Sequence, residues 1–332
     1  MAINTSDRTS DAAAGVHTDA RCCLCQGPMA PWLEVSRDWR RPDRADGAPY
    51  RVRWCQVCRF GRVDPRPTPA ELAAAYDVDD YYTHQTVSRT GKPDTTASLL
   101  DRVRLALAWR ADHGVMLTVD ELLRWVAPGG RVCDLGCGNA RLLAEGKARG
   151  LSVVGVEPDP AARQTARSRG VPVLEGTAED LPASLPRDSF DAVVLSHSLE
   201  HCLDPVVALR HAAGLLRPGG VALVEVPNNE AAGLREAGAA WPWMDVPRHL
   251  SFFTAPSLRR LCERVGLTPQ QVQFAGYCRQ FRRDWIDQQA WIAATLDAPA
   301  RHSGLRLLLR TALGPAELKY DSVRVVARRA AA

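Results

Sequence analysis

An alternation of apolar runs and helix-forming segments between residues 130 and 227 restricts the fold more than any other feature of the chain. The apolar runs are "RVCDL", "LSVVGV", "VPVL", "FDAVVLS" and "VALVEVP". Two of the segments between them start with Asp159-Pro160 and Asp204-Pro205, in which Asp can cap a helix and Pro suits its first turn. Strands that alternate with helices predict a parallel sheet with helices on both faces. In such sheets, ligands bind beyond the carboxyl ends of the strands.

A glycine-rich turn follows the first apolar run, where Asp134 is succeeded by Gly136 and Gly138. Glycines let the backbone approach a ligand closely. Glu157 ends the second run, where a carboxylate can accept both hydroxyls of a ribose. These residues predict a nucleotide-containing ligand. They leave its class open, because NAD-binding sheets and other nucleotide-binding sheets share the pattern.

Paired cysteines near the amino terminus form a separate pattern. Cys22-x-x-Cys25 and Cys55-x-x-Cys58 supply four thiolates, which predicts a tetrahedral zinc site. Four protein ligands leave no open position, so we expect a structural zinc ion. Cys23 could replace Cys22 only with poorer geometry. The remaining cysteines are scattered and are predicted to be small buried residues: Cys133, Cys137, Cys202, Cys262 and Cys278.

Length and charge set wider limits. The chain has 332 residues, of which 46% are hydrophobic, and 42 basic residues nearly balance 38 acidic ones. The length permits a sizeable core, and the charge balance gives no argument for nucleic acid. Residues 1–20 are polar and small, which predicts a disordered lead-in rather than a signal peptide. Since no apolar run approaches the roughly 18 residues of a membrane helix, we expect a cytoplasmic protein.

The stretch "SHSLEH" contains His197, Glu200 and His201 directly after the fourth run, and His249 follows the fifth. Both loops open on the same edge of the predicted sheet, so His201 and His249 can face one pocket. Histidine suits a general base because its pKa lies near neutrality. The alternative is that Glu200 and His201 cap the following helix and brace its loop.

Several of these motifs, taken together and in order, resemble a known family. The motifs are "VCDLGCGNA", "VVGVEPD", "GTAEDLP", "SFDAVVLSHSLEHCLDP" and "LLRPGGVALVEVPN", which cover roughly residues 125 to 230. The chain resembles the class I S-adenosylmethionine-dependent methyltransferases, although Ala140 stands where the family often has a third glycine. The resemblance implies an α/β fold, a Rossmann-like seven-stranded, mostly parallel sheet. The sixth strand is expected near Val272–Phe274 and the seventh at Ser322–Val326.

The resemblance also implies which residues bind S-adenosylmethionine. Asp134, Gly136 and Gly138 would surround the methionine part of the cofactor, and Glu157 would hold the ribose. The other cofactor-binding residues implied are Pro158, Ala178, Glu179 and Asp180 in the second and third loops, and Ser196 and His197 after the fourth strand.

The predicted domain layout follows from the zinc pattern and the resemblance. We expect a zinc-binding module at 21–66, a helical linker or cap at 67–126, and a methyltransferase domain at 127–332. Within 67–126, Thr68 and Glu71 predict a capping box. An insertion at about 277–320 contains Trp285 and Trp291. It is a candidate lid or homodimer contact, with filler packing an equal alternative.

The zinc knuckles followed by "PRPTPAEL" resemble amino-terminal modules of bacterial methyltransferases that act on nucleotide sugars, surface glycans and secondary metabolites. We therefore expect a small-molecule or glycan-precursor acceptor, with O-methylation favoured over C- or N-methylation and His201 or His249 as base. The alternative is an RNA-modifying methyltransferase whose zinc module and arginine-rich segment 37–53 contact nucleic acid. Against it, the fourth strand ends in Ser-His-Ser and lacks the Asn/Asp-Pro-Pro-aromatic motif of amino-methylating nucleic-acid enzymes.

A second metal site is a further possibility. Ubiquinone O-methyltransferases and small-RNA 2′-O-methyltransferases resemble this stretch, with a Glu-x-x-Glu-His set for a divalent ion. His197 stands where the first Glu would be, which weakens the case for magnesium because magnesium prefers oxygen ligands. His197, Glu200, His201 and His249 holding a softer ion such as zinc stays open.

Overall fold

The computed structural model describes residues 21–42, 49–78, 99–111, 117–299 and 304–331. The predicted lead-in at 1–20 lies outside this part of the chain. Among the described residues, no helix combines the length and hydropathy that are needed to cross a membrane.

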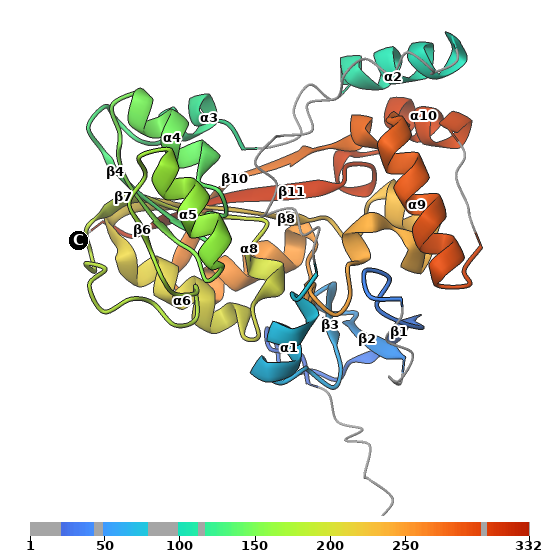
Figure 1. The fold of residues 1–332 in the computed structure, drawn as a ribbon, viewed down its shortest axis with the longest axis horizontal. Coiled ribbons are helices and arrows are strands. Elements are labelled where there is room, and N and C mark those ends of the chain that lie inside the picture. Colours follow the sequence, from blue (N-terminus) through green and yellow to red (C-terminus); the bar gives the residue numbers. More distant parts are fainter. Residues whose placement is uncertain (1–20, 43–48, 79–98, 112–116, 300–303, 332) are drawn as a thin grey trace, which may run out of the picture.

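A seven-stranded sheet forms the centre of the molecule (Figure 1), in the order β10-β11-β8-β7-β4-β5-β6. Only β11 runs antiparallel to its neighbours. The predicted mostly parallel sheet is therefore confirmed, including its sixth and seventh strands. The strands are β4 (Arg131–Leu135), β5 (Ser152–Val156), β6 (Val173–Leu174), β7 (Phe190–Ser196), β8 (Leu216–Pro227), β10 (Leu267–Ala275) and β11 (Ser322–Arg329).

Helices cover both faces of this sheet, as predicted. Because side chains alternate along a strand, Val194 packs in one core cluster and Leu195 in another. The cluster of Val194 includes residues of α3 (Val119–Leu123), α4 (Arg141–Ala148) and α5 (Pro160–Ser168). The cluster of Leu195 includes residues of α6 (Pro205–Leu215) and α8 (Ala255–Arg264).

The predicted helix starts are confirmed by their caps. The Asp159 carboxylate accepts hydrogen bonds from two backbone N–H groups of α5, and Asp204 does the same for α6. Thr68 and Glu71 form the capping box of α1 (Pro69–Ala75). These ends are set by residues adjacent in sequence, which is why the sequence predicts them well.

The start of the fifth strand differs from the prediction. The fifth apolar run, "VALVEVP", begins at Val221, but α6 stops at Leu215 and β8 already begins at Leu216. Leu216 pairs with Phe190, and the register then shifts before Val221 pairs with Ala192. Gly219 has φ +76°, a left-handed conformation that suits glycine within this irregular segment.

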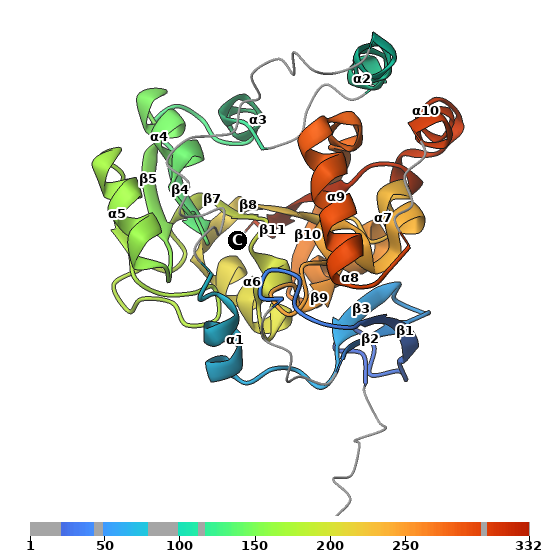
Figure 2. The ribbon, with the colours of Figure 1, turned by 45° about the vertical axis from the view of Figure 1, so that its right-hand side comes forward.

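A second, four-stranded sheet is built mainly from the amino-terminal region, in the order β1-β2-β3-β9. Figure 2 shows it beside the main sheet. Its edge strand β9 lies almost two hundred residues further along the chain than β3, its partner. The sheet therefore joins the cysteine-rich module to the loop that follows β8. Its strands are β1 (Ala30–Val35), β2 (Tyr50–Cys55), β3 (Phe60–Val63) and β9 (Ser251–Phe252).

The segment between β10 and β11 is mostly helical and contains α9 (Arg283–Thr295) and α10 (Gly304–Leu313). α9 packs on the amino-terminal module, because the rings of Trp39 and Trp291 meet edge to face with centroids 5.4 Å apart. α10 packs against α2 (Leu99–Ala111). Between β8 and β9 lies α7 (Ala232–Ala237).

Candidate active site and candidate metal centre

The glycine turn after β4 lies directly against the segment that follows β7. Gly136 has φ +82° and Gly138 has φ +52°. A Cβ atom on Gly136 would lie 2.6 Å from the Cβ of Ser198, so only glycine fits. The Ser198 hydroxyl also donates to the backbone carbonyl of Leu135 at 2.7 Å. The predicted glycine turn and the "SHSLEH" stretch therefore form one edge of the site.

Two buried carboxylates lie beside this turn. Glu157 accepts hydrogen bonds from the backbone N–H groups of Gly138 at 2.8 Å and Asp159 at 3.0 Å. Within the described chain, Oδ1 of Asp134 is buried and has no hydrogen-bond partner. Burial and the charge of Glu157 raise the pKa of Asp134 to about 7, and burial also raises the pKa of Glu157. A cationic ligand would relieve both effects.

The loop after β6 contains Ala178, Glu179 and Asp180, which were predicted to bind the cofactor. The Glu179 carboxylate accepts from the backbone N–H groups of Leu203 at 3.0 Å and Asp204 at 2.6 Å, so it braces the start of α6. Ala178 is buried and Asp180 is exposed. Pro158, also exposed, follows Glu157 at the neighbouring strand end.

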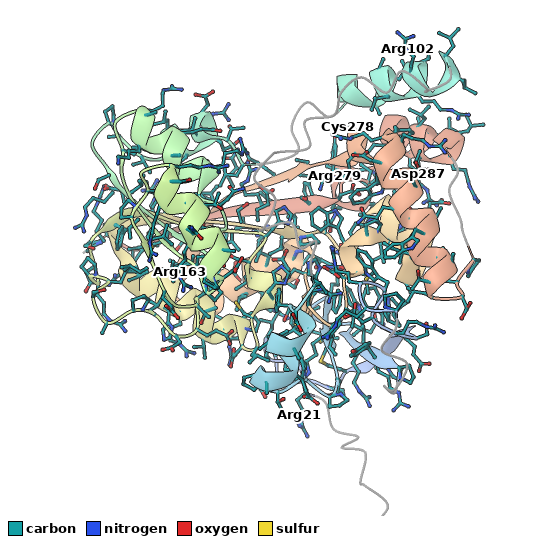
Figure 3. The ribbon with its side chains drawn as sticks, viewed as in Figure 1. Arg21, Arg102, Arg163, Cys278, Arg279 and Asp287 are labelled. Atoms are coloured by element: carbon teal, nitrogen blue, oxygen red, sulfur yellow. The ribbon has the colours of Figure 1, made fainter. Side chains whose placement is uncertain are left out.

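His197, next to Ser196 at the end of β7, lies between two buried glutamates. Its Nε2 is 3.1 Å from Glu225 Oε1 and its Nδ1 is 3.4 Å from Glu200 Oε1. Burial alone would lower the pKa of His197, but the two glutamates raise it to about 9. The His197 ring stacks on Trp243 with centroids 4.9 Å apart. The guanidinium of Arg279, labelled in Figure 3, lies 5.1 Å from the Trp243 ring centroid.

Glu225 and Arg324 complete this charged network, and sequence analysis missed both. They pair directly across β8 and β11, where Arg324 Nε donates to Glu225 at 2.6 Å. Burial would raise the pKa of Glu225, but His197 and Arg324 lower it to about 2. The available signal was a charged residue within each of the apolar strands "VALVEVP" and "SVRVV", since buried charges are paired.

His201 and His249 lie together, as predicted, with ring centroids 4.6 Å apart. The Nδ1 of His201 is 3.0 Å from the carbonyl oxygen of Arg248, and the Nδ1 of His249 is 2.8 Å from that of Trp243. Since a carbonyl oxygen only accepts, each Nδ1 carries the proton and each Nε2 keeps its lone pair. Burial lowers the pKa of His201, and burial with the nearby His201 lowers that of His249 to about 4.

Glu200 lies beside this pair and is fully buried. Within the described chain, neither of its carboxylate oxygens has a hydrogen-bond partner. One ligand atom each of Glu200, His201 and His249 lie within 4.8 Å of one another. The side chain of Asp204, and not that of Glu200, caps α6. The carboxylate of Glu200 is thus turned into the histidine cluster.

The four predicted cysteine ligands meet at one point. Single sulfur atoms of Cys22, Cys25, Cys55 and Cys58 lie within 4.8 Å of one another, and those of Cys25 and Cys55 are 3.6 Å apart. Sulfurs around a tetrahedral zinc ion lie about 3.8 Å apart, given Zn–S bonds of about 2.3 Å. Arg260 of α8 donates to the sulfur of Cys58 at 3.0 Å. The geometry and the donor set fit a zinc ion.

Comparison with known proteins identifies the family of this chain. Residues 108–272 match a family model described as a methyltransferase domain. An uncharacterized methyltransferase of Mycobacterium bovis is 33% identical over 207 residues, which are 56% of this chain and 84% of that protein. The chain belongs to the methyltransferase family. It is an S-adenosylmethionine-dependent methyltransferase, and S-adenosylmethionine is its cofactor.

Other relatives of this methyltransferase have more specific names. The ubiquinone biosynthesis O-methyltransferase of Aeromonas salmonicida is 33% identical over 169 residues, 46% of this chain and 71% of that protein. Among solved structures, a Thermotoga maritima methyltransferase titled a possible histamine N-methyltransferase has 23% identity and a TM-score of 0.43. That match covers 70% of this chain and 91% of the other.

Arg248 positions the histidines of the methyltransferase, and sequence analysis did not single it out. It is fully buried and contacts Asp38 and Asp245, each at 2.9 Å, and donates to the carbonyl of Ala75 at 2.8 Å. Burial would raise the pKa of Asp245, but Arg248 holds it well below its usual range. Arg248 therefore connects the loop that contains His249 to the amino-terminal region, through a contact with Asp38, which lies more than two hundred residues away in the sequence.

Proposed function

We propose that this methyltransferase transfers the methyl group of S-adenosylmethionine to a hydroxyl of a small molecule or glycan precursor, such as a nucleotide sugar or secondary metabolite. The observation that carries the proposal is the pair His201 and His249, whose Nδ1 atoms donate to backbone carbonyls so that each Nε2 keeps its lone pair, at the sheet edge that holds the glycine turn. The similarity to ubiquinone biosynthesis O-methyltransferases favours oxygen as the acceptor atom.

In this proposal, the residues after β4 and β5 bind the cofactor. The buried Oδ1 of Asp134 lacks a partner within the described chain and suits the ammonium group of the cofactor. Glu157 would exchange its bond to Gly138 for the ribose hydroxyls. The same edge would be lined by Gly136, Pro158, Ala178, Asp180 and Ser196. Glu179 and His197 would support it indirectly, Glu179 through the start of α6 and His197 through its two glutamate partners.

On the acceptor side, the proposed reaction is an in-line displacement. The hydroxyl oxygen bonds to the methyl carbon, the carbon–sulfur bond breaks with its electron pair left on sulfur, and the hydroxyl proton moves to a base. Alignment of the two reactants supplies roughly 7–11 kcal/mol. A positioned base adds about 10²–10⁴-fold. Because burial lowers the pKa of both His201 and His249, both are neutral and able to accept a proton near pH 7.

We also propose that Cys22, Cys25, Cys55 and Cys58 hold a structural zinc ion. The support is the convergence of the four sulfurs and the cationic Arg260, which offsets the negative charge of a zinc site with four thiolates. Four protein ligands leave no open coordination position, so the ion has a structural role. Zinc would stabilise the module by on the order of 10 kcal/mol.

The predicted domain boundaries remain a proposal. The main chain of β3 pairs with β9, so the zinc module of 21–66 shares its sheet with the methyltransferase domain of 127–332. We expect the two regions to unfold together for this reason.

The function can be tested with methyl-labelled S-adenosylmethionine and a panel of sugars, nucleotide sugars, phenols and bulk RNA. We expect label in an ether product that survives mild base, which distinguishes it from a methyl ester. Labelled RNA, or label on carbon or nitrogen only, would contradict the proposal. Calorimetry with the cofactor alone checks separately that the protein is competent to bind it.

A further inference from the structure

We propose that Glu200 is a positioning residue for methyl transfer, whose buried carboxylate stabilises the imidazolium that forms when His201 or His249 takes the proton of the acceptor. This inference rests on the proposed function, in which one of these histidines is the base. The proton moves from the acceptor oxygen to the histidine, and Glu200 stays ionised throughout. Glu200 is available for this role because Asp204, and not Glu200, caps α6.

The carboxylate of Glu200 lies beside both histidines. One oxygen of Glu200 and one ring nitrogen each of His201 and His249 lie within 4.8 Å of one another. Glu200 has no exposed surface, and within the described chain neither of its oxygens accepts a hydrogen bond. Charges interact more strongly in a buried site than in water, so the negative charge of Glu200 acts on both rings.

A buried base becomes a buried cation when it accepts a proton. Burial lowers the pKa of both His201 and His249, so either imidazolium is unfavourable without a compensating charge. The carboxylate of Glu200 acts in the opposite direction and raises the pKa of both rings. The attraction reaches full strength only as the proton arrives, so it stabilises the transition state more than the ground state.

The other groups that face the two histidines have partners of their own. Asp245 also acts on both rings, but its carboxylate accepts from Arg40 at 3.0 Å and from Arg248 at 2.9 Å. Tyr76 faces His201 through a hydroxyl, 2.9 Å from Nδ1. Of the two carboxylates, Glu200 is therefore the one that no arginine of the described chain neutralises.

A row of alternating charges behind Glu200 keeps it ionised. Nδ1 of His197 lies 3.4 Å from Glu200, and Nε2 of His197 lies 3.1 Å from Glu225. Arg324 in turn donates to Glu225 at 2.6 Å. Burial opposes each of these charges, yet the two glutamates raise the pKa of His197 to about 9, and His197 lowers the pKa of Glu200.

The backbone fixes His197 within this row. His197 has φ +53°, a left-handed conformation that is uncommon outside glycine. Its N–H donates to the carbonyl of Glu225 at 2.8 Å, and its ring stacks on Trp243 with centroids 4.9 Å apart. Strained residues persist where their surroundings hold them, and they concentrate at functional sites. The positive charge of His197 is thus held between the two glutamates.

The pH profile of the single-turnover rate in Glu200→Gln tests the proposal, with an acceptor that the labelling panel identifies. The substitution keeps the shape of the side chain and removes its charge. We expect the rate to fall about 10- to 100-fold and the acid limb to move about one unit to lower pH, because both histidine pKa values fall. The cofactor Kd should stay within twofold of wild type. An unmoved acid limb would overturn the proposal.

Glu236→Gln is the matched control. Glu236 is also a buried carboxylate, but it lies on α7 and pairs with Arg306 at 3.3 Å and Arg310 at 2.9 Å. This variant should lose unfolding free energy while its single-turnover rate and acid limb stay as in wild type. If its acid limb moved as far as that of Glu200→Gln, the effect would not belong to the histidine site and the proposal would be wrong.

A histidine NMR titration of the wild-type protein covers the case in which Glu200→Gln does not fold, and it needs no acceptor. We expect His197 to be doubly protonated at pH 7.5, and His201 and His249 to be neutral with Nε2 unprotonated. A neutral His197 at this pH would contradict the proposal, because Glu200 would then lack the positive charge that keeps it ionised.

The failure of this inference can be told apart from the failure of the proposed function. If wild type forms the labelled ether and His249→Ala loses turnover while Glu200→Gln keeps the wild-type profile, the positioning role is rejected and the function stands. If wild type forms no ether with any acceptor of the panel, the proposed function fails and this inference fails with it.

Discussion

The cofactor edge and the acceptor edge of this methyltransferase are built in different ways. The cofactor edge, formed by the segments after β4 and β5, depends on short motifs whose residues are adjacent in sequence. The acceptor edge combines Tyr76, His201 and the loop of Arg248 and His249, which are far apart in sequence. Local backbone geometry thus organises the first edge, and long-range buried contacts organise the second.

The largest expected effect is on the acceptor edge. Arg248→Met leaves Asp38 and Asp245 as buried charges without their main partner, which should cost about 3–5 kcal/mol of unfolding free energy. Arg217→Met is the control, since its ion pair with Asp191 is half exposed and worth about 1 kcal/mol or less. Denaturant unfolding measures both. Equal losses of unfolding free energy in the two variants would show that Arg248 stabilises the fold no more than an exposed ion pair does.

The next effect is on the cofactor edge. Gly136→Ala places a methyl group 2.6 Å from Ser198 at φ +82°, and the backbone strain alone amounts to about 1–3 kcal/mol. Gly150→Ala is a matched control, because Gly150 has φ +86° but nothing within 4 Å of its added Cβ. We expect cofactor affinity to fall about tenfold or more only in Gly136→Ala. Similar losses in both variants would mean that strain, and not the contact with Ser198, matters.

These two comparisons show what the sequence could reveal. The glycine turn, the caps at Asp159 and Asp204 and the cysteine pairs depend on neighbouring residues, so their patterns predicted them. Arg248 was missed because its two carboxylate partners come from different regions of the chain. The pairing of β3 with β9 was missed for the same reason, since β9 is only two residues long and has no strand pattern of its own.

A smaller effect concerns the pH dependence of cofactor binding. The pKa of Asp134 is raised to about 7, so this carboxyl is largely protonated below that pH and charged above it. A cationic cofactor needs the carboxylate, so affinity should rise between about pH 6 and pH 7.5, up to tenfold per pH unit below the pKa. Calorimetry across this range checks it. The Asp134→Asn variant should bind the cofactor weakly, with an affinity that does not change with pH. If its affinity still rose with pH, the pH dependence would belong to another group.

The smallest expected effect concerns the contact between the amino-terminal region and the acceptor edge. Tyr76→Phe removes the contact of the Tyr76 hydroxyl with His201 Nδ1, 2.9 Å apart. A hydrogen bond contributes about 0.5–1.5 kcal/mol, so kcat should fall about two- to tenfold with cofactor affinity unchanged. Steady-state kinetics measures the change. A loss of cofactor affinity instead would mean that Tyr76 supports the other edge.

The division between the two edges is tested most directly by His249→Ala, with kcat and the cofactor Kd measured on the same preparation. His249 lies on the acceptor edge, where its ring contacts His201 and Trp243. We predict a fall in kcat of about 10²–10⁴-fold with the cofactor Kd within twofold of wild type. Full turnover in this variant, or a parallel loss of cofactor binding, would contradict the account.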